Sequence, residues 1–112
     1  MDKPDEYYEL HAAVCKTFGH PKRLRVIELL QDKELIVSDI ARETGIDISN
    51  LSQHLHLMKD KGILLARREG TKVFYKIAHP NIWDAVKLMS EFLHERIDRS
   101  QRVISVDGLS HK

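Results

Sequence analysis

The sequence predicts a mainly helical fold of the α+β class, with five helices and one β-hairpin. Apolar residues recur at steps of three or four along most of the 112-residue chain, which is typical of amphipathic helices. Glycines and prolines separate these stretches, as they do where helices end and begin. One segment alternates apolar and polar residues on both sides of Gly70-Thr71, which indicates two short strands. The composition, 42% hydrophobic and 31% charged, excludes a disordered or collagen-like chain.

The first two predicted helices are separated by a glycine and a proline. Gly19 ends the first helix and Pro21 opens the second, the usual placement of these residues. In the second helix we expect Leu24, Ile27 and Leu30 to face inward. The apolar positions of the first helix are Tyr7, Leu10, Val14, Cys15 and Phe18.

The third and fourth predicted helices each begin at a serine. Ser38 is expected to cap the third helix, with Asp39 at the positive end of the helix dipole and Gly45 at its end. Ser49 is expected to cap the fourth helix, which Gly62 closes. The apolar face of the fourth helix carries Leu51, Leu55 and Met58.

A hairpin and a long helix complete the chain. The hairpin has strands over Leu64–Glu69 and Lys72–Ile77, joined by a two-residue turn that starts with glycine. Pro80 opens the last helix. Its apolar positions are Ile82, Val86, Met89, Leu93 and Ile97.

The order is therefore α-α-α-α-β-β-α, with a short turn over Ile46–Ile48 between the third and fourth helices. Such a turn is typical of the helix-turn-helix, in which the second helix enters the DNA major groove. The hairpin beside it forms a wing, so the sequence predicts a winged helix-turn-helix. We expect residues 1–104 to form one domain and residues 105–112 a flexible tail.

Charge is concentrated in one part of the chain. The whole sequence carries a formal net charge of only +1, yet residues 59–76 hold six basic and two acidic side chains. A local excess of this kind attracts a polyanion. A basic face that only meets solvent is the alternative.

Three motifs resemble the ArsR/SmtB family of bacterial and archaeal transcriptional repressors. They are Gly19–Ile27 in the second helix, Ser49–Leu55 in the fourth and Arg67–Tyr75 in the wing. The resemblance implies a homodimer in which the first and last helices pack together. It also implies that two recognition helices read a near-palindromic operator in double-stranded DNA.

The terminal helices carry the residues expected at this dimer interface. They supply more apolar surface than so small a core needs, and an isologous dimer requires a self-complementary surface. The alternative is that these residues only close the monomer's own core. They are Tyr7, Leu10, Val14, Met89, Phe92 and Leu93.

Short or planar polar groups on the fourth helix are suited to reading base edges, since Asn and Gln pair bidentately with adenine. The alternative is a solvated surface with a simple helix cap. The expected base-reading residues are Ser49, Asn50, Ser52, Gln53 and His54. The expected contacts with the DNA backbone, from the wing and the third helix, are Ser38, Arg67, Arg68, Thr71 and Lys72.

The effector sites of the family are not evident in this sequence. Ile36-Val37-Ser38 stands where arsenic- and cadmium-type sensors carry Cys-Val-Cys, so the thiolates that such ions require are missing. Residues on the last helix could approximate the family's zinc site, but their spacing departs from its motif: Asp84, His94, Glu95 and Asp98. We therefore predict no metal or cofactor and leave the small effector unknown.

The only cysteine, Cys15, lies on an apolar stripe and is expected to be a small buried side chain. A disulfide to the dimer mate is the alternative.

Other functional classes fit the sequence less well. It has no glycine-rich phosphate loop and no nucleophile elbow, so we do not expect an enzyme. Its apolar runs are too short to span a bilayer, and its polar, acidic start lacks the plan of a secretion signal, so we expect a cytoplasmic protein. A winged helix used for protein–protein contact is the main rival. That rival predicts an acidic or apolar fourth helix and a neutral wing.

Overall fold

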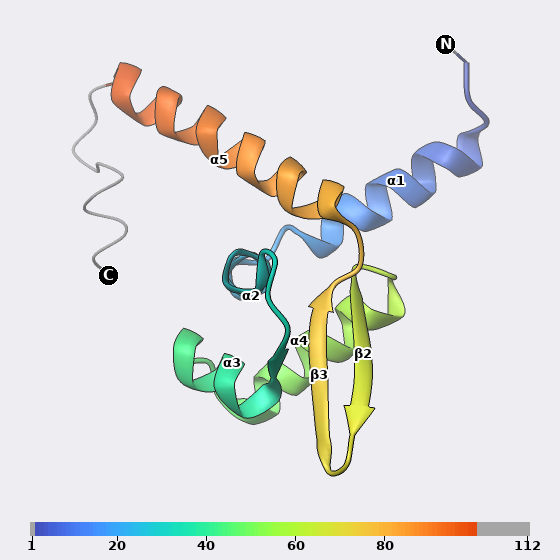
Figure 1. The fold of residues 1–112 in the computed structure, drawn as a ribbon. Coiled ribbons are helices and arrows are strands. Elements are labelled where there is room, and N and C mark those ends of the chain that lie inside the picture. Colours follow the sequence, from blue (N-terminus) through green and yellow to red (C-terminus); the bar gives the residue numbers. More distant parts are fainter. Residues whose placement is uncertain (1, 101–112) are drawn as a thin grey trace.

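The computed structural model describes residues 2–100. All five predicted helices and the predicted hairpin are present (Figure 1), and the strand limits agree with the prediction. The expected tail, 105–112, lies outside the described residues. The elements are α1 (Asp5–Thr17), α2 (Pro21–Leu30), β1 (Leu35–Ile36), α3 (Val37–Thr44), α4 (Ile48–Asp60), β2 (Leu64–Glu69), β3 (Lys72–Ile77) and α5 (Pro80–Ser100).

The structure adds a strand that sequence periodicity missed. β1 pairs antiparallel with β3, Leu35 opposite Tyr75 and Ile36 opposite Phe74, and the sheet order is β1-β3-β2. A two-residue strand is too short to show an alternating pattern, so its pairing is decided by the tertiary structure.

The core lies between α2, α3, α4 and one face of the sheet. Val26, Ile27 and Leu30 of α2 are fully buried, but Leu24, predicted to face inward, is 38% exposed. Leu24 lies about 110° around the helix from the centre of the buried stripe, so the expectation for it was wrong. The other buried apolar residues are Ile40, Ile46, Leu51, Leu55, Met58, Ile63, Leu64 and Tyr75.

Neither serine caps a helix as predicted. α3 starts at Val37 because β1 leads directly into it, and it has no side-chain cap, so Ser38 lies within the first turn. α4 starts at Ile48 and is capped by Asp47, whose carboxylate accepts a hydrogen bond from the Asn50 N–H at 3.2 Å. Asp is as good a cap as Ser, and here it comes first along the chain.

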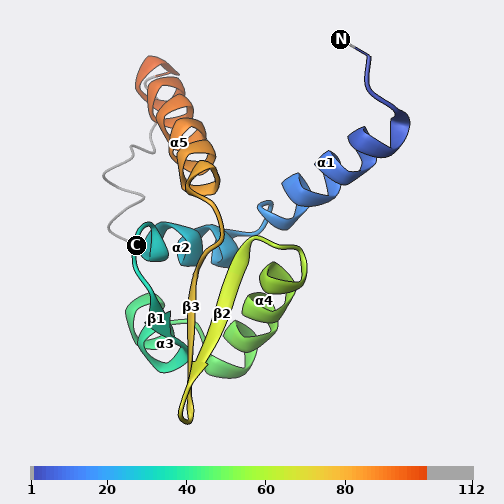
Figure 2. The ribbon, with the colours of Figure 1, turned by 45° about the vertical axis from the view of Figure 1, so that its right-hand side comes forward.

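α1 and α5 project from this body on the side away from the hairpin turn (Figures 1 and 2). The body covers each of these helices only at the end where the helix joins the body. Most of the apolar residues along both helices are exposed. No helix in residues 2–100 is both long enough and apolar enough to cross a membrane.

Candidate nucleic-acid interface

The turn between α3 and α4 is held by hydrogen bonds on both sides of Gly45. The Thr44 hydroxyl donates to the Ile40 carbonyl at 2.7 Å and accepts from the Ile46 N–H at 3.2 Å. Arg25 of α2 donates to the Thr44 carbonyl. Gly45 adopts the left-handed conformation, φ 74°, that favours glycine at a helix end. These contacts fix the angle at which α4 leaves the turn, and the sequence reasoning did not identify Thr44 or Arg25.

α4 presents a polar face to solvent at its N-terminal end. Ser49, Asn50 and Gln53 are exposed and Ser52 is half-buried, while the opposite face is in the core. The exposure expected of Ser49, Asn50 and Gln53 is therefore observed, and Ser52 lies at the edge of this face. The N-terminal residues of a recognition helix are those that reach base edges in helix-turn-helix proteins.

His54 does not belong to this face. It is 8% exposed, and its Nδ1 accepts a hydrogen bond from Arg23 Nε at 3.2 Å. Arg23 also donates to the Thr17 carbonyl at 3.1 Å, so the contact joins α4 to the α1–α2 junction. The prediction that His54 is a base-reading residue was therefore wrong. Leu51, His54, Leu55 and Met58 follow the i, i+3, i+4, i+7 spacing of one helix face, a signal that the sequence contained.

The surroundings of His54 disfavour its charged form. Burial lowers the pKa of His54 below its ordinary value of 6.5, and electrostatic repulsion of the protonated imidazole by His20, Arg23 and Lys22 lowers it further. The His20 ring lies 4.6 Å from the His54 ring, centroid to centroid. These surroundings favour the neutral imidazole, in which Nδ1 accepts the hydrogen bond from Arg23.

The two arginines of the wing have different surroundings. Successive residues of a strand point to opposite faces, so Arg67 shares a face with Phe74, opposite it, and Arg68 shares the other face with Val73. Arg67 donates to both carboxylate oxygens of Glu34, at 2.9 and 2.8 Å. Its guanidinium, expected to be free for phosphates, is thus already engaged.

The remaining cations of the wing are available to a ligand. Arg68 and Lys72 are exposed and make no ion pair within residues 2–100, and Thr71 is exposed at the turn. Gly70 has φ 63°, which the two-residue turn requires. Ser38 is exposed on the first turn of α3. The structure therefore leaves these four side chains accessible, as predicted.

The six terminal-helix residues predicted for the dimer interface are exposed, so they do not close the monomer's own core. Leu10 is 69% exposed on α1 and Phe92 is 59% exposed on α5. Tyr8 and Leu88, which the sequence reasoning did not select, belong to the same two surfaces. The other exposed members are Tyr7, Val14, Met89 and Leu93.

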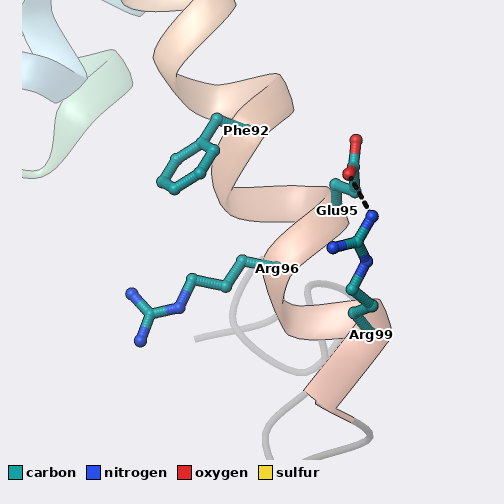
Figure 3. A pocket seen from close by; sticks show the side chains of 4 residues that line it. All are labelled: Phe92, Glu95, Arg96 and Arg99. Atoms are coloured by element: carbon teal, nitrogen blue, oxygen red, sulfur yellow. Dashed lines mark hydrogen bonds and ion pairs between the residues drawn. The ribbon is translucent and has the colours of Figure 1, made fainter.

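The C-terminal half of α5 continues this surface. Phe92 and Arg96 point to one side of the helix, and the ion pair between Glu95 and Arg99, at 3.1 Å, lies on another side (Figure 3). The four side chains line a shallow surface hollow.

The residues considered for a sensor site are dispersed. Cys15 is exposed rather than buried, because α1 projects from the body. Glu95 is paired with Arg99, and Asp84, His94 and Asp98 are exposed along α5. The described part of the chain contains no group of three or more His, Cys, Asp or Glu side chains arranged to hold a metal ion.

Comparison with known proteins decides the family. A sequence profile described as "Bacterial regulatory protein, arsR family" matches residues 20–64. The HTH-type transcriptional regulator Rv0081 of Mycobacterium tuberculosis, described as uncharacterized, is 36% identical over 95 residues, which cover 80% of this chain and 83% of that protein. The chain belongs to the ArsR family. It is a transcriptional regulator with a winged helix-turn-helix DNA-binding fold.

Other relatives of this ArsR-family regulator agree in fold. The crystal structure of Rv0081 has a TM-score of 0.78 at 31% identity, covering 90% of this chain and all of that one (100%). The winged domain of Mb0332 from Mycobacterium bovis, described as homodimeric, has a TM-score of 0.76 at 30% identity, covering 85% and 88%. The transcriptional repressor PagR of Bacillus anthracis is 34% identical over 93 residues, covering 80% and 93%.

Proposed function

We propose that this ArsR-family regulator is a homodimeric repressor that binds a specific, near-palindromic operator in double-stranded DNA. One observation carries the proposal: the exposed polar face of α4 is held by the Thr44 turn beside a wing with free cations. A rigid reading helix supplies sequence discrimination, and phosphate contacts supply affinity and register.

The base-reading set is Ser49, Asn50, Ser52 and Gln53, without His54. Asn50 and Gln53 are exposed on the first turns of α4 and have the planar amides that pair bidentately with adenine. Ser49 is free to contact bases because Asp47, not Ser49, caps the helix.

The phosphate contacts are Arg68, Lys72, Thr71 and Ser38. The first three lie at the outer end of the wing and Ser38 on the first turn of α3, where the N-terminal end of a helix attracts an anion. In the proposed complex Arg68, at the outer end of the wing, enters the minor groove.

The dimer surface is formed by the exposed apolar residues of α1 and α5. Large exposed apolar surfaces mark interaction sites, and the relative Mb0332 is described as homodimeric. Two recognition helices of a symmetric dimer would span half-sites about 34–36 Å apart. Repression is proposed from the likeness to PagR, and the proposed site of action is the cytoplasm. We assign no metal site within residues 2–100, and we assign no effector.

The test is fluorescence anisotropy with the duplex immediately upstream of the protein's own gene and a scrambled duplex of equal length. The titrations are repeated across a salt series, with reductant present. We expect tight, salt-sensitive binding with about a thousandfold preference for the upstream duplex. Weak binding that is equal on both duplexes and insensitive to salt would contradict the proposal and favour the protein–protein module.

A further inference from the structure

The outer part of the hairpin extends beyond the end of β1, so that only β2 and β3 continue there. β1 pairs only with Phe74 and Tyr75 of β3, so residues 68–73, here called the outer wing, form a ribbon of two strands. Two-stranded ribbons are marginally stable alone and twist more than wider sheets. The orientation of the outer wing therefore depends on what holds it at Phe74.

An ion pair crosses the sheet at this position. Glu34 directly precedes β1, and Arg67 on β2 lies opposite Phe74 of the central strand. Arg67 Nε and Nη2 donate to the Glu34 carboxylate at 2.9 and 2.8 Å, and its guanidinium carbon lies 4.4 Å from the Phe74 ring centroid. One side-chain group thus connects all three strands on the outer face of the sheet.

We propose that Glu34 and Arg67 form a clamp that holds the outer wing in position for the duplex, with Arg67 as a positioning residue and not a phosphate ligand. The function of the clamp rests on the proposed DNA binding. Bidentate Arg–carboxylate pairs fix geometry as well as charge, and stacking on Phe74 restrains the guanidinium further.

The charges around Arg67 also make it a poor phosphate ligand. Its Nη1 lies 3.4 Å from a Glu69 carboxylate oxygen, so two carboxylates face one guanidinium. The pair with Arg67 lowers the pKa of Glu34, which favours the charged carboxylate, and a charged carboxylate repels phosphate. Arg68, on the other face, has no such partner within the described residues.

Charge-conserving variants test the clamp. Glu34→Asp shortens the carboxylate by one methylene and Arg67→Lys removes the planar fork, yet neither changes the net charge. We expect each single variant to weaken operator binding about three- to tenfold. The double variant should bind about as tightly as the weaker-binding of the two single variants, because both substitutions disrupt the same contact.

The salt dependence separates positioning from phosphate contact. Each phosphate contact contributes about 0.9 to the slope of log affinity against log salt. We expect Arg67→Gln to retain the wild-type slope. The matched control, Arg68→Gln, should make the slope less steep by about one unit. A less steep slope for Arg67→Gln would overturn the clamp. Additive losses of affinity in the Glu34→Asp, Arg67→Lys double variant would also overturn it.

A measurement without DNA distinguishes failure of the clamp from failure of the proposed function. Backbone ¹⁵N relaxation reports the order parameters of the Gly70 and Thr71 amides. We expect these to fall from about 0.85 toward about 0.6 in Glu34→Asp, with no change in α2. Unchanged order in the outer wing would refute the clamp. A looser outer wing in a protein that binds no duplex would support the clamp and refute the DNA-binding proposal.

Discussion

Gln53 and His54 are neighbours in the sequence whose side chains have opposite surroundings. Gln53 is exposed on the polar face of α4, whereas His54 is 8% exposed and bonded to Arg23. Both are polar residues, but the helical spacing places His54 on the buried face with Leu51, Leu55 and Met58. The two residues therefore lead to different predictions, one on binding and one on stability.

Gln53→Ala should reduce discrimination without reducing nonspecific affinity. A bidentate amide–base contact is worth about 1–3 kcal/mol, so we expect operator affinity to fall about tenfold or more and affinity for scrambled DNA to stay unchanged. Anisotropy titrations on both duplexes measure this. Equal losses on the two duplexes would contradict a base-reading role.

Stability should fall as the pH is lowered through the titration of His54. The pKa of His54 is lowered in the folded state. As the pH falls below about 6.5, His54 is therefore protonated more in the unfolded chain than in the folded protein. The stabilisation is complete above that pH and is lost progressively below it. Urea denaturation at pH 7.5, 6.5 and 5.5 measures the effect.

His54→Gln keeps a hydrogen-bond acceptor for Arg23 but does not titrate, so its stability should decline less with falling pH than that of the wild type. His56→Gln is the matched control, because His56 lies on the same helix and is exposed. An identical pH dependence of wild type and His54→Gln would contradict this account.

At the scale of elements, the turn between α3 and α4 determines how the reading helix is presented. The Thr44 hydroxyl satisfies the N–H of Ile46, a residue that is only 5% exposed. Because a buried donor without a partner is costly, the turn depends on this one hydroxyl group. The Thr44 hydroxyl contacts Ile40 and Ile46 and none of the proposed base-reading residues. Its effect on DNA binding is therefore indirect.

Thr44→Val should destabilise the fold by about 1–3 kcal/mol, since it leaves the Ile46 N–H unsatisfied. Thr44→Ser, which keeps the hydroxyl, should cost much less. Urea denaturation of both variants and the wild type measures the difference in the free energy of unfolding. Similar losses for the two variants would show that the methyl group, and not the hydroxyl, matters.

At the scale of the whole molecule, α1 and α5 extend from the body with their apolar residues exposed (Figure 2). The body already has a closed core formed by α2, α3, α4 and the sheet. Only the start of α5 packs against that core, through Ile82, Trp83 and Val86. A second copy of the chain is the proposed partner for the apolar surface that the two helices leave exposed.

Phe92→Glu should convert the dimer into a folded monomer and lower operator affinity by about a hundredfold or more, because one reading helix replaces two. Light scattering coupled to size-exclusion chromatography measures the mass, and circular dichroism checks the fold. Leu65→Glu is the matched control: Leu65 is also an exposed apolar residue, 48% exposed, but it lies on the hairpin. A dimer that persists in Phe92→Glu, or a monomer in both variants, would contradict the proposed surface.

The sequence by itself determined the helix order, the hairpin and its register, and the polar face of α4, because these follow from local spacing and turn residues. Glycine and proline positions marked the ends of elements, and the alternation on both sides of Gly70-Thr71 indicated the two strands. The motifs in the second helix, the fourth helix and the wing were enough to indicate the family.

Only the tertiary structure decided the contacts between residues distant in the sequence. The two-residue strand β1, the Arg23–His54 contact, the Arg25–Thr44 bond and the Glu34–Arg67 pair each join separate elements. No periodicity encodes such contacts, since their energy depends on where two surfaces meet. For the same reason Arg67 and Arg68, adjacent and identical in the sequence, differ in their surroundings: Arg67 is paired with Glu34, and Arg68 has no ion pair within residues 2–100.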